Sequence, residues 1–296
     1  MQTGLPTLVV LGLGLIGGSL ARALRENGFC GHIIGCGHRA PSLRRGVELG
    51  VIDEYTLDTD AAFALADIFV ICTPTLTAAR VVQELAPRMG AEGPVVTDVA
   101  SVKGNLRDAA LGAAGAMPPR LVLAHPIAGS ERSGVDASRA DLFVNHRVIL
   151  TPVEGNAPEA VQLVRSMWES TGAEVVDMPV DTHDAVLAAT SHLPHLLAYA
   201  LVDALASSDN GDEVFRCAAG GFRDFTRIAS SDPTMWRDIA LANRGALLDA
   251  MDQFSEHLAR LRAAVAAGDA ETMQATFTRA KAARDAFAGI LAQRDQ

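Results

Sequence analysis

Residues 9–19 read Val9-Val10-Leu11-Gly12-Leu13-Gly14-Leu15-Ile16-Gly17-Gly18-Ser19, an apolar run that leads into a Gly-x-Gly-x-x-Gly loop. A helix-forming run follows at residues 21–26, and a second strand is expected at residues 32–35. In such a strand, loop and helix, the first glycine allows a tight turn, the second lets the backbone approach a pyrophosphate, and the third lets helix and strand pack closely. The sequence therefore predicts a dinucleotide site, with contacts from Gly12, Gly14, Leu15, Ile16 and Gly17.

Short β-rich runs alternate with helical segments over the first 178 residues, which is typical of an α/β fold with a parallel, doubly wound sheet. The expected strands are 8–11, 32–35, 68–72, 95–97, 121–124, 148–151 and 174–176. After Pro179 and Asp181 the β pattern stops, and apolar residues recur at helical spacing. We predict a Rossmann-type dinucleotide-binding domain over residues 1–179 and an all-helical substrate-binding and dimerisation domain over residues 180–296.

Residues 185–206 form a long apolar pattern with small side chains on several faces, which usually requires burial on more than one side. We therefore predict a homodimer built on this helix. Pro194 removes one helical hydrogen bond within the pattern, so we expect a kink and a freed carbonyl near Thr190. Residues 249–296 mix charge with apolar residues at helical spacing and predict capping helices, not a regulatory βαβ unit.

Charge and cysteine usage exclude several classes of protein. Lys and Arg number 25 against 35 Asp and Glu, so the formal net charge is −10 and we expect no nucleic-acid partner. The four cysteines form no Cys-x-x-Cys pair, which predicts reduced thiols, a cytoplasmic protein and no structural metal. No uninterrupted apolar run of about 18 residues is present, so we expect no membrane span.

Two polar clusters follow predicted strands and therefore fall at the carboxyl edge of the sheet, where ligands of doubly wound folds bind. The first is Asp98-Val99-Ala100-Ser101-Val102-Lys103-Gly104, in which Ser101 is either a site residue or only the N-cap of the next helix. The second is His125-Pro126-Ile127-Ala128-Gly129-Ser130-Glu131. Hydride removal from an alcohol carbon requires a base for the hydroxyl proton, and a histidine can accept it near neutral pH. Because the expected nucleotide site is adjacent, we predict that His125 is catalytic instead of structural.

A third group of polar residues is spread over the helical half, in residues 191–195, 220–229 and 232–237. His192 and His195 share a helical face, but no third ligand pattern accompanies them, so a metal site is disfavoured. Guanidinium groups that can bind a carboxylate in a bidentate fork are supplied by Arg223, Arg227, Arg237 and Arg244. The alternative is surface ion pairs with Asp224 and Asp238, which we expect to account for some of them.

These motifs together resemble the prephenate and arogenate dehydrogenase family of tyrosine biosynthesis. The matching stretches are Gly-Leu-Gly-Leu-Ile-Gly-Gly-Ser, Asp-x-x-Ser-Val-Lys, His-Pro-Ile-Ala-Gly-Ser-Glu, Ser-His-Leu-Pro-His and Gly-Gly-Phe-Arg-Asp-Phe-Thr-Arg-Ile-Ala. The resemblance implies that His125 bonds to the substrate C4 hydroxyl and that Ser101 orients His125 and the nicotinamide. It also implies that Arg227 binds a substrate carboxylate and that His195 lies beside the substrate side chain. Glu131, with Ser130 next to it, is then expected at the mouth of the site.

The implied reaction is an oxidative decarboxylation. Hydride leaves C4 of the substrate for the cofactor, His125 accepts the hydroxyl proton, and loss of the ring carboxylate as CO2 makes the product aromatic. Prephenate and arogenate differ in a keto or amino group on the side chain, and His195 favours prephenate without deciding between them. We expect no appended ligand-sensing ACT domain after the helical half, so any tyrosine feedback is expected at the active site itself.

The choice between NAD and NADP stays open. A dinucleotide site usually offers an acidic residue to the ribose after the second strand, but here Gly37, His38 and Arg39 follow it. Arg39 could instead meet the 2′-phosphate of NADP. Thr73 and Pro74, after the strand at 68–72, complete the expected cofactor contacts.

Two rival classes remain. The β-hydroxyacid dehydrogenases resemble this chain in layout but use a catalytic lysine on a helix, whereas this chain has only Lys103 and Lys281. A nucleotide-sensing protein that has lost its chemistry is the rival from another class. Such a protein would be expected to lack some of Ser101, His125, His195 and Arg227, and all four are present.

Overall fold

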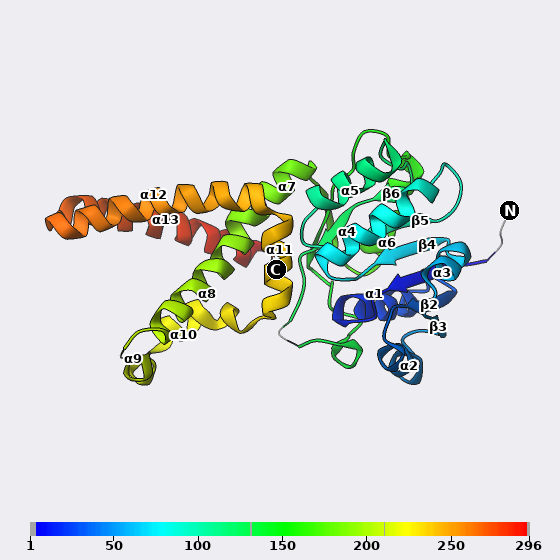
Figure 1. Cartoon of the computed structure of the whole chain (residues 1–296), viewed down its shortest axis with the longest axis horizontal. Coiled ribbons are helices and arrows are strands. Elements are labelled where there is room, and N and C mark those ends of the chain that lie inside the picture. The colour runs from blue at the N-terminus through cyan, green and yellow to red at the C-terminus, as the bar shows by residue number, and fades with distance from the viewer. Residues whose placement is uncertain (1–3, 131, 210, 295–296) are drawn as a thin grey trace. The chain divides into compact units, whose positions relative to one another are not determined.

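The computed structural model describes residues 4–130, 132–209 and 211–294 (Figure 1). Its strands are β1 (Thr7–Leu11), β2 (His32–Cys36), β3 (Glu54–Thr56), β4 (Ile68–Ile71), β5 (Val95–Asp98), β6 (Leu121–Val122), β7 (Ala124–Pro126), β8 (Arg147–Leu150) and β9 (Glu174–Asp177). The first group of helices is α1 (Leu15–Glu26), α2 (Ala40–Glu48), α3 (Thr59–Leu65), α4 (Thr75–Leu85), α5 (Gly104–Ala114) and α6 (Pro158–Glu169). They are followed by α7 (Val180–Leu187), α8 (Leu193–Ala206), α9 (Gly211–Cys217), α10 (Gly220–Thr226), α11 (Pro233–Ala242), α12 (Arg244–Ala267) and α13 (Ala270–Arg294).

The main sheet is parallel, with strand order β3-β2-β1-β4-β5-β6. This order confirms the predicted Rossmann-type fold. It reverses direction between β1 and β4, and ligands of such sheets bind in the crevice outside the carboxyl ends of the strands at that point. The loops after β1 and β4 therefore flank the expected cofactor position.

Alternating side chains of the central strands separate two apolar cores, because neighbouring residues of a strand face opposite sides of the sheet. Leu8 and Val10 of β1 pack in one core with residues of α1 and α6. Val9 and Leu11 pack in the other with residues of α3, α4 and α5. Helices on both faces leave only the strand ends open to ligands.

Three of the predicted strands lie wholly or partly outside the main sheet. The predicted strand at 121–124 divides into β6, which pairs with β5, and β7, which pairs antiparallel with β8. β8 and β9, at the expected strands 148–151 and 174–176, complete a separate mixed sheet of order β7-β8-β9. A physical reason for the change of sheet is visible at Ala124, whose backbone N–H and C=O are bound by the buried side chains of Asp98 and Lys103 instead of a strand. The sequence pattern also missed the short edge strand β3.

The chain divides into two compact units, residues 1–243 and residues 244–296. Helices α7 to α11 thus belong to the same unit as the sheet, and α5 contacts α7 directly. In the second unit, α12 and α13 pack against each other, which confirms the helices predicted over residues 249–296. The predicted boundary after residue 179 separates the dinucleotide-binding domain from the helical domain. It differs from the division into these two units and stays a prediction.

Residues Val180–Ala206 form one continuous helical stretch. A π-helical segment, η3 (Ala188–His192), joins α7 to α8 just before Pro194. The helical hydrogen-bond pattern therefore changes just before Pro194, and π segments are frequent at functional sites. The kink and the freed carbonyl predicted from Pro194 stay predictions. In the described part of the chain, this stretch alone has the length and mean hydropathy (1.4) of a membrane span, and 28% of its most apolar window is buried. Because its first half carries the buried polar side chains His183, Asp184 and His192, which are costly in a bilayer, we keep the prediction of no span.

Candidate active site

The nucleotide loop has the geometry that its three glycines predict. Gly12 has a φ of +100°, and a Cβ there would lie 2.7 Å from the carbonyl oxygen of Cys72. A Cβ on Gly17 would lie 2.4 Å from the Gly12 oxygen and 2.8 Å from Cγ1 of Val10. Both positions therefore exclude side chains because the protein itself fills the space.

Gly14 differs, because a Cβ there would meet nothing within 4 Å. Gly14 is the N-cap of α1 and no side chain caps the helix, so its first N–H groups have no partner from a cap. Free amides and open space at a helix N-terminus suit a pyrophosphate. Close by, Thr73 carries a buried hydroxyl that has no hydrogen-bond partner among the described residues. These features fit a dinucleotide, which these groups would hold when it is bound.

The other predicted cofactor residues lie around this loop. Leu15 and Ile16 open α1, half-buried against the core. Pro74 is the N-cap of α4 and is exposed. Arg39 is the exposed N-cap of α2, just beyond the end of β2. All four thus lie at the carboxyl ends of β1, β4 or β2, on one edge of the sheet.

A buried ion pair anchors the loop between β5 and α5. Lys103 Nζ donates to Asp98 Oδ2 and, at 2.6 Å, to the backbone oxygen of Ala124, and both charged side chains are fully buried. Burial lowers the pKa of Lys103 and raises the pKa of Asp98, while their mutual attraction opposes both shifts. The ammonium group of Lys103 is therefore bonded within the protein interior and is not available as a catalytic lysine. This argues against the β-hydroxyacid dehydrogenase alternative.

Ser101 lies half-buried in this loop. Its interpretation as an N-cap is wrong, because α5 begins at Gly104 with Lys103 as the N-cap residue. The N–H groups of Lys103 and Gly104 are bound instead by the carboxylate of Asp184, at 2.9 and 2.8 Å. Among the described residues no hydrogen bond joins Ser101 to His125, so the orienting role implied for Ser101 stays a prediction.

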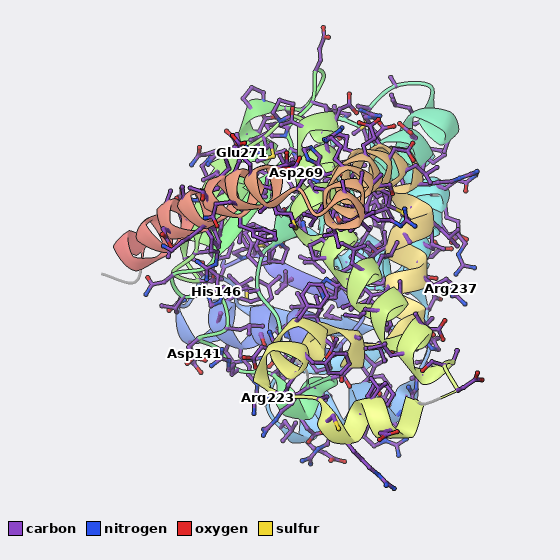
Figure 2. The ribbon with its side chains drawn as sticks, turned by 90° about the vertical axis from the view of Figure 1, so that its left-hand side faces the viewer. Asp141, His146, Arg223, Arg237, Asp269 and Glu271 are labelled. Carbon is purple, nitrogen blue, oxygen red and sulfur yellow. The ribbon has the colours of Figure 1, made fainter. Side chains whose placement is uncertain are left out.

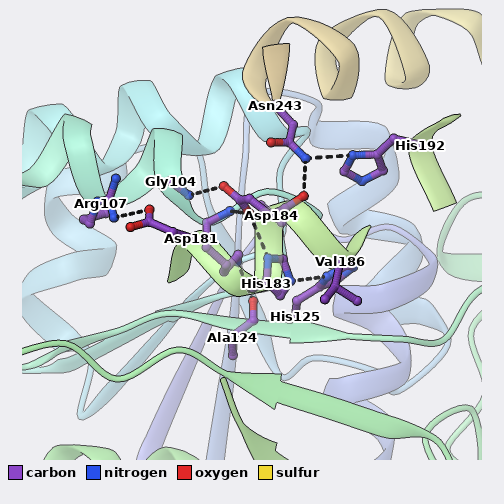
Figure 3. Close-up of polar contacts among 12 residues, drawn as sticks. Gly104, Arg107, Ala124, His125, Asp181, His183, Asp184, Val186, His192 and Asn243 are labelled. Carbon is purple, nitrogen blue, oxygen red and sulfur yellow. Dashed lines mark hydrogen bonds and ion pairs between the residues drawn. The ribbon is translucent and has the colours of Figure 1, made fainter. Parts of the chain in front are cut away.

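His125 lies on β7 and is joined to two polar residues of α7 (Figure 3). Its Nδ1 is 2.9 Å from Nε2 of His183, and Nδ1 of His183 is 2.8 Å from Oδ1 of Asp184. Burial lowers the pKa of His125 well below 6.5, and His183, Lys103 and His192 lower it further. The ring is therefore neutral at physiological pH, the form that can accept a proton.

His192 is held beside this chain by Asn243. The Asn243 amide donates to the backbone oxygen of Asp184 at 2.8 Å and lies 3.0 Å from Nδ1 of His192 (Figure 3). Burial lowers the pKa of His192 to about 4. No group of three His, Cys, Asp or Glu in the described ranges is arranged to hold a metal ion. His192 is thus engaged as a structural acceptor.

His195 stacks on Trp236, with ring centroids 3.5 Å apart and an interplanar angle of 19°. Its Nδ1 is 2.8 Å from the carbonyl oxygen of Ser191, one residue beyond the freed carbonyl predicted near Thr190. Burial lowers the pKa of His195, and the positive charge of nearby Arg227 acts in the same direction. The charge of Arg227 thus acts on His195, and the predicted substrate-binding roles of both residues stay predictions.

The arginines divide between the two alternatives that the sequence left open. Arg223 forms an exposed ion pair with the neighbouring Asp224, whereas Arg237 pairs with the neighbouring Asp238, whose side chain is buried; Figure 2 labels both arginines at the surface. Arg227 begins the 3-10 turn η4 (Arg227–Ser230), is exposed, and forms no ion pair with any residue that the structure describes. It is therefore the available guanidinium of this segment.

The last two predicted substrate contacts follow β7. Ser130 is exposed, and its hydroxyl accepts from the Arg132 N–H at 3.1 Å. Glu131 lies outside the described residues.

Sequence reasoning missed four residues of this region: His183, Asp184, Trp236 and Asn243. Little marks them in the sequence, because each acts through a partner that is distant along the chain. Asp184 bonds to the start of α5 some 80 residues away, and Asn243 reaches His192 across 51 residues. The adjacent pair His183 and Asp184 in an otherwise apolar helical pattern was the one signal available.

Two family models match the chain in sequence. One is described as the nucleotide-binding domain of prephenate dehydrogenase and matches residues 20–177. The other is described as the dimerization domain of prephenate dehydrogenase and matches residues 179–279. Together they span most of the chain.

Individual relatives agree with these models. The prephenate dehydrogenase of Bacillus subtilis (strain 168) is 38% identical over 282 residues, which cover 94% of this chain and 75% of that protein. The cyclohexadienyl dehydrogenase of Zymomonas mobilis is 34% identical over 286 residues, which cover 94% of each chain. A crystal structure of prephenate dehydrogenase from A. aeolicus, in complex with hydroxyphenyl propionate and NAD+, has a TM-score of 0.88 and 36% identity, covering 97% of this chain and 100% of that one. Synechocystis arogenate dehydrogenase has a TM-score of 0.79 and 30% identity, covering 95% and 99%.

Proposed function

This chain belongs to the prephenate dehydrogenase family, and we propose that it catalyses the NAD(P)-dependent oxidative decarboxylation of prephenate to 4-hydroxyphenylpyruvate, a step of tyrosine biosynthesis. The observation that carries the proposal is the position of His125. His125 lies on β7, directly after β6 and in contact with β5, and its neutral ring is paired with His183. The glycine loop after β1 fits a dinucleotide.

The cofactor and His125 have separate roles in the proposed reaction. When NAD(P)+ is bound, its nicotinamide supplies the hydride acceptor. His125 accepts the proton of the C4 hydroxyl as hydride leaves C4 of the substrate. Loss of the ring carboxylate as CO2 leaves its electron pair in the ring, which becomes aromatic, and the C4 oxygen then takes the proton back from His125. His125 thus ends the cycle unchanged, and it serves as a base despite its lowered pKa because loss of hydride makes the hydroxyl strongly acidic.

We propose that Arg227 binds a substrate carboxylate and that His195 contacts the substrate side chain, with Ser130 and Glu131 at the mouth of the site. An exposed guanidinium without an ion pair among the described residues supports the role of Arg227. Ser101, half-buried in the loop after β5, is proposed to orient the nicotinamide and His125.

Arogenate is a second candidate substrate, favoured by the hydrogen bond of His195. A carbonyl oxygen only accepts, so Nδ1 of His195 carries a proton that it donates to Ser191, and a neutral ring then presents Nε2 as an acceptor. An acceptor suits the ammonium group of arogenate, whereas the keto oxygen of prephenate needs a donor and hence a protonated ring. The identity of His195 alone is therefore a weaker argument for prephenate than the sequence suggested.

Steady-state kinetics with prephenate and arogenate, each with NAD+ and NADP+, tests the proposal. We expect reduction of the nicotinamide that depends on at least one of the two substrates, with a higher kcat/KM for prephenate. A higher kcat/KM for arogenate would support the second candidate. A folded protein that binds dinucleotide but turns over none of the four pairs would instead be the nucleotide-sensing alternative.

Dimerisation is supported by the match to the dimerization domain of the family. We propose that the dimer is a homodimer formed through residues 180–296, where large apolar side chains such as Leu201, Phe225, Leu248 and Leu258 are exposed. We also propose a cytoplasmic location, with which four free cysteines agree. Light scattering at micromolar concentration should give the mass of a dimer, and a monomer would refute this part of the proposal.

A further inference from the structure

The hydrogen bonds from His125 to His183 and from His183 to Asp184 determine which ring nitrogen of each histidine carries a proton. Oδ1 of Asp184 lies 2.8 Å from Nδ1 of His183, and an ionised carboxylate can only accept. Burial alone would raise the pKa of Asp184, but hydrogen bonds from His183 and from the N–H groups of Lys103 and Gly104 outweigh burial and lower it. Asp184 is therefore ionised, and Nδ1 of His183 carries the proton between them.

The contact between His183 and His125 fixes the next proton in the same way. A neutral His183 protonated at Nδ1 has a lone pair on Nε2, which is 2.9 Å from Nδ1 of His125. Two lone pairs do not form a hydrogen bond, so Nδ1 of His125 must carry the proton that is donated to His183. Nε2 of a neutral His125 is then the unprotonated nitrogen of the ring.

We propose that His183 and Asp184 are positioning residues that hold His125 in the tautomer with a basic Nε2. The carboxylate sets the tautomer of His183, and His183 sets that of His125. When Nε2 accepts the substrate hydroxyl proton, the resulting imidazolium keeps its Nδ1–H bond to His183, with the negative charge of Asp184 behind it. The proposal rests on the proposed function for the identity of that hydroxyl, but the tautomer itself does not depend on any substrate.

Asp184 is itself fixed in position. Its two oxygens accept from the backbone at the N-terminus of α5, where the helix dipole favours a negative charge. A Cβ on Gly104 would lie 2.7 Å from Oδ2 of Asp184, so a glycine is required for this approach. The charged and titratable groups that face His125 are His183 on α7, Lys103 before α5 and His192 in η3. Of these, His183 is the one hydrogen-bonded to the His125 ring.

Nitrogen NMR of the histidine rings in the unliganded protein tests the tautomer directly. The His125 signals are assigned by their loss in His125→Gln. We expect a protonated Nδ1 and an unprotonated Nε2 in the wild-type protein. A His125 ring protonated at Nε2 instead would overturn the proposal, even if the enzyme turns over prephenate.

Asp184→Asn provides the second test, because the asparagine amide can donate to Nδ1 of His183 and reverse the direction of the chain. We expect His125 to become protonated at Nε2, and kcat to fall by about 10²–10⁴-fold, as when a catalytic histidine is held in the wrong tautomer. Asp181→Asn is the matched control, because Asp181 lies on the same helix but is exposed and pairs only with Arg107 among the described residues. The control should retain the wild-type tautomer and kcat.

His183→Phe completes the design if Asp184→Asn does not fold. It keeps an aromatic ring against His125, with which His183 makes an edge contact at a centroid distance of 5.1 Å, but removes the acceptor. We expect a mixture of His125 tautomers and a lowered kcat. Wild-type kcat in His183→Phe or in folded Asp184→Asn would refute the positioning role, whereas failure of the wild-type enzyme to turn over any substrate would refute only the proposed function.

Discussion

Gly14 and Gly17 allow cofactor binding to be separated from folding stability with two identical substitutions, Gly14→Ala and Gly17→Ala. Both glycines belong to the nucleotide loop, but the space around them differs. At Gly14 the backbone is extended, with φ −107° and ψ −155°, and an added Cβ meets no protein atom within 4 Å. At Gly17 the same Cβ would lie 2.4 Å from a backbone oxygen inside the core.

The expected magnitudes follow from these contacts. Overpacking costs about 1–3 kcal/mol, and a contact with rigid backbone at Gly17 belongs at the upper end of that range. Alanine in a helix regains about 0.5–1 kcal/mol, so Gly17→Ala should lose about 2 kcal/mol of stability, or about 4–8 °C in Tm. Gly14→Ala should change Tm by no more than about 2 °C, because nothing in the protein must move. Its methyl group instead takes space that a pyrophosphate needs, which should raise the Kd of the dinucleotide by about 5- to 150-fold.

Thermal unfolding and isothermal titration with NAD+ and NADP+ measure the two effects separately. The wild-type protein is the reference for both. Wild-type affinity for both dinucleotides in Gly14→Ala would refute the assignment of this loop as the pyrophosphate site. An equal loss of Tm in the two variants would refute the distinction drawn from the space around them.

Four further predictions concern single side chains. His125→Asn should lower kcat by about 10²–10⁴-fold while dinucleotide binding is retained, and a kcat within a few-fold of wild type would remove His125 from the mechanism. Arg227→Lys should lower kcat/KM by about 10- to 150-fold through KM, because a lysine lacks the bidentate fork, whereas Arg223→Lys should have little effect; equal effects would contradict the assignment. Arg39→Ala should raise the KM for NADP+ more than the KM for NAD+, and an unchanged ratio would place the ribose elsewhere. His192, whose pKa falls to about 4 on folding, binds its proton more readily in the unfolded chain, so the free energy of unfolding should decline as pH falls from about 6.5 to 4, and less steeply in His192→Gln.

The sequence was sufficient for the parts of the molecule that depend on local patterns. Gly12, Gly14 and Gly17 fall on the spacing of a known loop, and the apolar strands around them alternate with helices, so the Rossmann-type sheet could be predicted. Pro194 likewise indicated the part of the long helix where the α-helical pattern changes to a π segment, because the loss of one backbone donor is a local property.

The parts that depend on distant contacts could not be predicted. The division of residues 121–124 between two sheets requires Asp98 and Lys103 to bind the backbone of Ala124, which no periodicity reveals. The hydrogen-bonded pair His183 and Asp184, which contacts His125, was missed for the same reason, because His183 lies 58 residues away from His125 along the chain. For Ser101 the sequence left an N-cap open as an alternative, and the structure excludes that alternative because Asp184 from another helix binds the N–H groups at the start of α5.

The release of carbon dioxide from labelled substrate tests the proposed reaction most directly. Prephenate carrying an isotopic label in the ring carboxylate is incubated with the protein and with NAD+ or NADP+, and the label released is compared with the reduced nicotinamide formed. We predict one labelled CO2 for each reduced nicotinamide, with neither product in the absence of the dinucleotide. Reduced nicotinamide without release of label, or release of label without reduction, would contradict the proposed oxidative decarboxylation.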